Sequence, residues 1–161
     1  VLNDVGPDMN EPGLARIRAQ LGKGGNWPSW LAAARDIARR QADLYPGWQL
    51  DDWLAHAKRL CRVSRAGPIV WDYDPEIAAP LNLPHGDQQL DLWLALDSYR
   101  DRPVLSVRGG HSDILLAETQ ARMQARIPRL SAVTVPRVGH APTLDEPEAV
   151  AAMQAFLDPF L

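Results

Sequence analysis

The last third of the sequence contains one pattern twice: an apolar run, a short loop and an amphipathic segment. The runs 103–107 and 130–135 are short and rich in β-branched residues, which predicts buried strands. Apolar residues recur at helical spacing over 117–127 and again after Pro147, a residue suited to the first turn of a helix. Strand, helix, strand and helix in this order form a crossover unit, so we expect two parallel strands in an α/β fold.

The loops after these two strands carry residues suited to catalysis. Asp113 lies in the loop after the first strand, and His140 follows a glycine after the second. Because the carboxyl ends of neighbouring parallel strands meet at one edge, a carboxylate there can orient an imidazole. His140 is therefore a candidate base and Asp113 a candidate acid. The alternatives are a histidine bonded to nearby backbone and an aspartate that caps the following helix.

The middle of the chain is mostly helical by its apolar spacing. Helices are predicted at 10–21, from about 28 to 44, and at 51–62, followed by an extended piece at 67–71. The segment 79–86 is the expected linker back to the sheet, and 87–99 is predicted to be helical. Trp27 and Trp30 belong to an aromatic stripe that is either a substrate wall or ordinary core.

Both ends of the chain resemble the α/β-hydrolase family. The resemblance is carried by Gly-Gly-His-Ser-Asp at 109–113, by Val-Gly-His-Ala-Pro-Thr-Leu-Asp-Glu-Pro-Glu at 138–148, and by Val-Leu-Asn-Asp-Val-Gly-Pro at 1–7. It implies a partial sheet of about three parallel strands with a helical cap. The implied domains are a core strand at 1–7, a helical cap at 8–84, and the carboxyl-terminal part of the core at 85–161.

The resemblance also implies a catalytic triad of which this chain holds two members. It assigns His140 as the base and Asp113 as the acid. Asp4 is the alternative acid, because some members of the family carry the acid after the strand that the opening resembles. The alternative role for Asp4 is to bond loop backbone together with Asn3.

The nucleophile that the family places in Gly-x-Ser-x-Gly is absent from this sequence. None of the serines stands in that setting: Ser29, Ser64, Ser98, Ser106, Ser112 and Ser131. The resemblance therefore implies hydrolysis of a small-molecule carboxylic ester by a Ser-His-Asp mechanism whose serine lies outside this chain. The chain alone is then expected to be inactive. The expected partner is the missing amino-terminal half of the hydrolase, or a second copy through self-association.

Other functions stay open at this point. One alternative is a non-catalytic binding module, or an inactive fragment, derived from an α/β-hydrolase. Another is a C–C bond hydrolase, an epoxide hydrolase or a dehalogenase. The nucleophile would distinguish these enzymes, because an aspartate forms an alkyl-enzyme and a serine forms an acyl-enzyme.

Composition excludes several other classes. A formal net charge of −3 argues against nucleic-acid binding, and no apolar run is long enough to span a membrane. The single Cys61 excludes an internal disulfide and, with no signal peptide visible, favours a cytoplasmic protein. His111 could join Asp113 and His140 in a metal cluster, but no fourth ligand has suitable spacing. We therefore predict no metal and no cofactor, and we expect His111 at the rim of the pocket.

Overall fold

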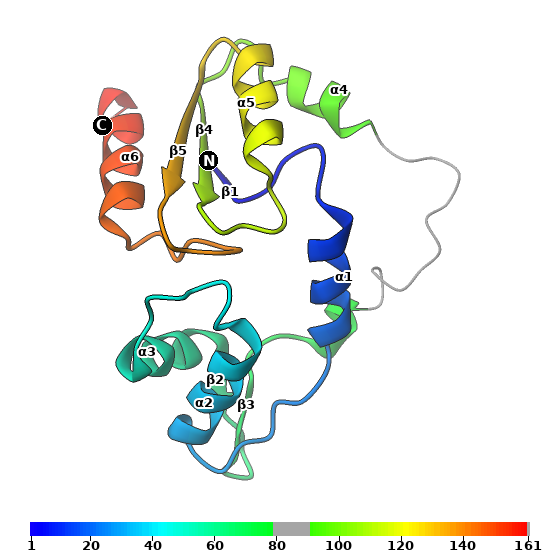
Figure 1. Ribbon diagram of the computed structural model, residues 1–161, viewed down its shortest axis with the longest axis vertical. Coiled ribbons are helices and arrows are strands. Elements are labelled where there is room, and N and C mark those ends of the chain that lie inside the picture. Colours follow the sequence, from blue (N-terminus) through cyan, green and yellow to red (C-terminus); the bar gives the residue numbers. More distant parts are fainter. Residues whose placement is uncertain (79–90, 161) are drawn as a thin grey trace. The chain divides into compact units, whose positions relative to one another are not determined.

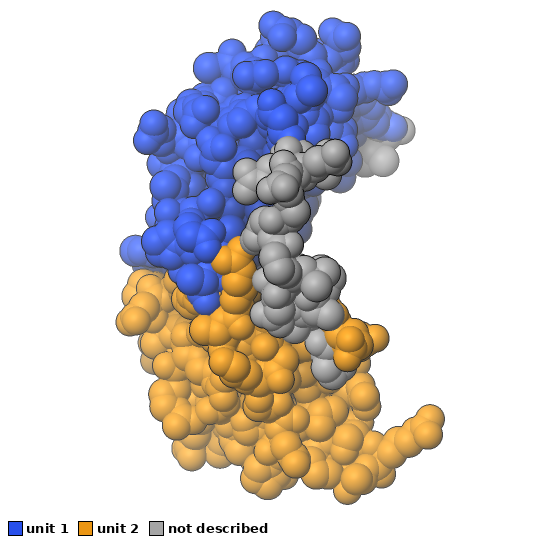
Figure 2. All heavy atoms as spheres, turned by 90° about the vertical axis from the view of Figure 1, so that its right-hand side faces the viewer, with its two compact units in different colours: residues 1–15, 85–161 blue, residues 16–84 orange. Residues whose placement is uncertain are grey.

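The computed structural model describes residues 1–78 and 91–160 (Figure 1). These residues fall into two compact units, which Figure 2 distinguishes by colour: unit 1 contains residues 1–15 and 85–161, and unit 2 contains residues 16–84. The predicted linker 79–86 and the start of the predicted helix 87–99 lie outside the described residues.

Unit 1 is built on a parallel sheet of three strands. These are β1 (Leu2–Asn3), β4 (Val104–Gly109) and β5 (Leu130–Val135), in the order β1-β4-β5. Strands β4 and β5 pair along their whole length, and Asn3 of β1 pairs with Val107. The expected partial sheet of about three parallel strands is therefore confirmed. Its carboxyl edge brings together the loops that follow all three strands.

Helices cover both faces of this sheet (Figure 1). Helix α5 (Ala117–Arg126) forms the crossover between β4 and β5, and α6 (Pro147–Leu157) follows β5 on the opposite face. The short α4 (Leu92–Asp97) is capped by Asp91, whose carboxylate accepts hydrogen bonds from the backbone N–H groups of Trp93 and Leu94. A 3-10 turn, Asp158–Phe160, follows α6.

The core of unit 1 lies between the sheet and α5. Its buried side chains contribute about 1.5–3 kcal/mol each by the usual value for removing an aliphatic or thioether side chain from water. They are Leu96, Val104, Leu115, Met123, Ile127 and Leu130, with Leu2 packed against them. The core thus fixes β1 against β4 through Leu2.

Unit 2 is mostly helical. After α1 (Glu11–Gln20), which crosses from unit 1, it contains α2 (Trp30–Gln41) and α3 (Leu50–Leu60). Ser29 begins α2, since its hydroxyl accepts the N–H of Ala32 at 3.2 Å. A 3-10 turn, Pro75–Ala78, ends the described part of the unit. Among the described residues, no helix is both long and apolar enough to cross a membrane.

A hairpin that the sequence did not predict follows α3. The helix was expected to continue through Arg62, but it ends at Leu60, and β2 (Cys61–Val63) pairs antiparallel with β3 (Ile69–Trp71). The turn between them is closed by a hydrogen bond from Ser64 N–H to the Pro68 carbonyl, with Gly67 at a φ of 103°. Pairing with β3 therefore overrides the helical spacing at this point.

Candidate active site

Asp4 directly follows β1 and is completely buried. Its φ is 56°, a left-handed conformation that aspartate adopts more readily than most residues. Its backbone N–H still donates to the Val107 carbonyl at 2.7 Å, so the chain leaves the sheet only after Asp4. The local backbone thus places the carboxyl group at the carboxyl edge of the sheet.

Both carboxylate oxygens of Asp4 are hydrogen bonded. Oδ2 lies 2.9 Å from Nδ1 of His140, and Oδ1 accepts the backbone N–H of Gly109 at 2.8 Å. An ionised carboxylate only accepts hydrogen bonds, so Nδ1 of His140 must carry the proton in this contact. In the neutral imidazole, Nε2 is then left as an acceptor. This arrangement fixes one tautomer and one orientation of the ring.

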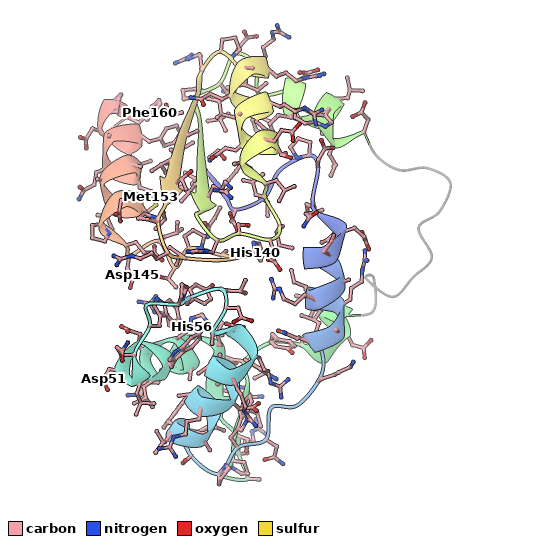
Figure 3. The ribbon with its side chains drawn as sticks, in the orientation of Figure 1. Asp51, His56, His140, Asp145, Met153 and Phe160 are labelled. Carbon is pink, nitrogen blue, oxygen red and sulfur yellow. The ribbon has the colours of Figure 1, made fainter. Side chains whose placement is uncertain are left out.

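His140 lies on the loop between β5 and α6 (Figure 3), and its side chain is 22% exposed. The loop before it is held by a hydrogen bond from the His111 N–H to the Val138 carbonyl at 2.8 Å. It also passes very close to the end of β4: a Cβ at Gly109 would lie 2.3 Å from the Gly139 carbonyl oxygen. A side chain at Gly109 would therefore push the His140 loop away from the sheet.

The loop after His140 is held by Glu146, a residue whose role was not predicted from the sequence. Its carboxylate accepts the N–H of Thr143 at 2.8 Å and the N–H of Leu144 at 2.9 Å, where Leu144 has a φ of 68°. The Thr-x-x-Glu spacing of Thr143 and Glu146, just before a helix, resembles a capping box and was the available signal. Glu146 therefore fixes the turn that leads from His140 into α6.

Nδ1 of His140 contacts Asp4, the residue that the sequence offered as the alternative acid. Strand β1 lies beside β4, so a residue directly after β1 reaches the His140 loop. Asp113 lies further along the loop after β4, where its carbonyl accepts the side-chain N–H of Asn10 at 3.1 Å. Gly13 packs against the same carbonyl, since a Cβ there would lie 2.1 Å from the oxygen. The loop that holds Asp113 thus packs against the beginning of α1.

The other predicted site residues lie in the loop after β4 and in unit 2. His111 is exposed, and its backbone, as described above, holds the His140 loop. Trp27 is buried in unit 2, where its indole N–H donates to Asp36 at 3.3 Å, and Trp30 is half-buried at the start of α2. Pocket lining by these residues stays a prediction. Across residues 1–78 and 91–160, no three His, Cys, Asp or Glu side chains lie close enough together to hold a metal ion.

Comparison with known proteins identifies the family. A model of the alpha/beta hydrolase family matches residues 3–153, so this chain belongs to the α/β-hydrolase family. Among its relatives is a 3-hydroxybutyrate-oligomer hydrolase from Cupriavidus necator, 34% identical over 97% of this chain and 55% of the relative.

Two solved structures resemble the chain over nearly its whole length. An α/β hydrolase from Novosphingobium aromaticivorans is 46% identical, with a TM-score of 0.90, over 98% of this chain and 55% of that one. An E-2-(acetamidomethylene)succinate hydrolase is 25% identical, with a TM-score of 0.68, over 96% of this chain and 55% of that one. The chain therefore spans about half the length of the relatives that it matches.

Proposed function

We propose that this chain supplies the acid–base pair of a hydrolase that cleaves carboxylic esters by a Ser-His-Asp mechanism. The observation that carries the proposal is the 2.9 Å contact between Asp4 Oδ2 and His140 Nδ1, made by a completely buried carboxylate. It leaves Nε2 of His140 to act on a nucleophile. Asp4 is the acid in this proposal, and Asp113 is not.

In the proposed reaction, Nε2 of His140 is the base. His140 takes the proton of a serine hydroxyl through Nε2 as the serine oxygen attacks the ester carbonyl, and the buried Asp4 carboxylate stabilises the imidazolium that forms. His140 then gives this proton to the departing alkoxide, leaving an acyl-serine. A water molecule, deprotonated by the same Nε2, then attacks the acyl-serine. His140 gives that proton to the departing serine oxygen, which releases the acid and restores the serine hydroxyl.

The nucleophilic serine lies outside this chain in the proposal. Ser106 is completely buried in β4, beside the side-chain amide of Gln120 at 3.2 Å. The hydroxyl of Ser112 accepts two backbone N–H groups, from Ile114 and Leu115, each at 3.1 Å. The chain also covers only 55% of the relatives that it matches. We infer that the partner is a further segment of the same hydrolase, the missing amino-terminal half, and that the chain alone is inactive or self-associates.

The proposed substrate is an ester of a small or medium hydroxy acid. The support is the relative from Cupriavidus necator, which is named as a hydrolase of 3-hydroxybutyrate oligomers. Short oligoesters of 3-hydroxybutyrate are therefore the first compounds to assay, together with p-nitrophenyl acetate and butyrate as generic esters.

The test compares the 161-residue chain with the product of the complete reading frame that encodes it. We expect the longer protein to hydrolyse these esters, the 161-residue chain to show no turnover, and His140→Ala to abolish turnover in the longer protein. A longer protein that folds and binds esters without cleaving them would contradict the proposal and favour a non-catalytic binding module.

A further inference from the structure

Asn3 and Asp4 are adjacent at the end of β1, and both side chains reach the loop that holds His140. Asp4 Oδ2 lies 2.9 Å from His140 Nδ1, and the Asn3 side-chain N–H donates to the Pro142 carbonyl at 3.0 Å. These contacts join residues that are 136 and 139 positions apart in the sequence. The end of one strand therefore provides both the partner of the ring and a hydrogen bond to the backbone two residues further on.

The orientation of the Asn3 amide follows from its partner. The Pro142 carbonyl can only accept a hydrogen bond, so the NH₂ group of Asn3 must face it. Oδ1 then points elsewhere, and it is buried without a hydrogen-bond partner among the described residues. A buried acceptor without a partner is destabilising, and asparagine is disfavoured in strands. An apolar residue would suit the stability of β1 better, so the bond to Pro142 is the contribution that is specific to asparagine.

The other hydrogen bonds that hold the His140 loop come from other parts of unit 1. The N–H of His111 holds the Val138 carbonyl from the loop after β4, and Glu146 holds Thr143 and Leu144 from the start of α6. Asn3 connects the loop to the end of β1, which Asp4 directly follows. Strand β1 has only two residues, and both the bond from Asn3 to Pro142 and the contact of Asp4 with His140 are made at its end.

We propose that Asn3 is a positioning residue for the Asp4–His140 pair, acting through the Pro142 carbonyl. The inference rests on the proposed function, because the pair matters for catalysis only if it moves the proton. Without the bond from Asn3, Pro142 and the His140 ring move relative to the Asp4 carboxylate. A displacement of about 1 Å at a reacting group costs on the order of 100-fold in rate.

The first experiment monitors the hydrogen bond between Asp4 and His140 in the 161-residue chain. Asn3→Leu keeps a branched side chain of similar size and removes both the donor and the unpartnered acceptor. Asn10→Leu is the matched control, since the Asn10 side chain makes the same kind of bond, to the Asp113 carbonyl at 3.1 Å. We expect the NMR signal of the His140 Nδ1 proton to shift or broaden in Asn3→Leu and to be unchanged in Asn10→Leu. Urea unfolding should show that Asn3→Leu is at least as stable as the native chain.

The second experiment uses the product of the complete reading frame. Asn3→Leu is expected to lower kcat by about 10- to 100-fold with KM within about twofold of the native value, and Asn10→Leu to leave both unchanged. If Asn3 had a purely structural role, Asn3→Leu would lower the stability of the protein and would not lower kcat selectively at an unchanged KM.

Three outcomes separate the inference from the proposed function. An unchanged His140 Nδ1 proton signal in folded Asn3→Leu would overturn the inference even if the enzyme is active. If the native longer protein has no esterase activity, the proposed function fails, while the NMR comparison still decides the role of Asn3. If Asn3→Leu does not fold, Asn3→Ala measured in the same way against Asn10→Ala decides it.

Discussion

The carboxylate of Asp4 and the imidazole of His140 are 136 residues apart in the sequence and 2.9 Å apart in the structure. The contact exists because β1 lies parallel beside β4 and ends just before Asp4, whose left-handed backbone keeps the carboxylate at the edge of the sheet. The second carboxylate oxygen is held by the Gly109 N–H. The pair is therefore fixed from strand β1, from strand β4 and from the loop after β5.

Substitution of each aspartate in turn should show whether Asp4 or Asp113 is the acid that acts with His140. In the product of the complete reading frame, Asp4→Asn is expected to lower kcat by about 10³- to 10⁴-fold, because an amide at this position favours the wrong tautomer of His140. Asp113→Asn should change kcat by no more than about threefold, because Asp113 is not the acid in the proposed mechanism. Steady-state ester hydrolysis measures both. A larger loss in Asp113→Asn than in Asp4→Asn would restore Asp113 as the acid.

The close approach at Gly109 predicts a stability effect. In Gly109→Ala the new Cβ would lie 2.3 Å from the Gly139 carbonyl oxygen, so the His140 loop must move, at a cost of about 1–3 kcal/mol of unfolding free energy. Gly47→Ala is the control, because a Cβ there meets no atom within 4 Å. It should change stability by less than about 0.5 kcal/mol. Urea unfolding compares the two, and equal stabilities would show that the loop accommodates the methyl group freely.

His56 should make unit 2 less stable in acid. Burial, with a smaller contribution from the charge of Arg59, lowers the pKa of His56 from 6.5 to about 4. The ring lies among aromatic side chains, with its centroid 5.0 Å from that of Trp48. Between these two pH values the unfolded chain binds a proton that the folded chain does not, so the free energy of unfolding rises with pH across this window. Acidification from pH 7 to pH 4 should lower it by up to about 3 kcal/mol through this group.

The variant His56→Phe tests this assignment. It keeps an aromatic ring and replaces Nδ1, which is buried without a hydrogen-bond partner among the described residues. Urea unfolding between pH 4 and pH 7 should therefore depend less on pH in His56→Phe than in the native chain. An equally steep dependence in both would mean that other groups cause the acid sensitivity.

Cys61 should react slowly with alkylating agents in the folded chain. Burial, and to a lesser extent the charge of Asp72, raises the pKa of the Cys61 thiol from 9.0 to about 11. Since the thiolate is the reactive form, this shift lowers the rate with iodoacetamide at pH 8 by about 100-fold relative to the unfolded chain. Intact mass spectrometry in buffer and in 8 M urea measures the two rates, and similar rates in both would contradict the burial of the thiol.

The fold was largely predictable because the strands and helices of unit 1 have strong local patterns. The strand at 130–135 and the helix after Pro147 agree with β5 and α6. The contact between Asp4 and His140 was not predictable in the same way. Asp113 and His140 belong to consecutive strand–loop units, which the order of residues reveals, whereas the contact of Asp4 depends on β1 lying next to β4. That neighbour relation is a property of the folded sheet.

The hairpin in unit 2 was missed for a related reason. Arg62 continues the helical spacing of α3, and the antiparallel pairing of Cys61 with Trp71 that ends the helix involves residues across a turn. The sequence indicated only that the Asn3 side chain could bond to loop backbone. The structure shows that this bond is made to the Pro142 carbonyl. Contacts between distant segments thus decided the details of the site, and local patterns decided the elements that carry them.

The most direct test of the account is the intact mass after incubation with a fluorophosphonate, which labels activated serines. We expect the 161-residue chain of 17.8 kDa to gain no adduct. We expect the product of the complete reading frame to gain one adduct, on a serine outside residues 1–161, and Asp4→Asn to slow this labelling strongly. An adduct on the 161-residue chain, or labelling of the longer protein that does not depend on Asp4 or His140, would contradict it.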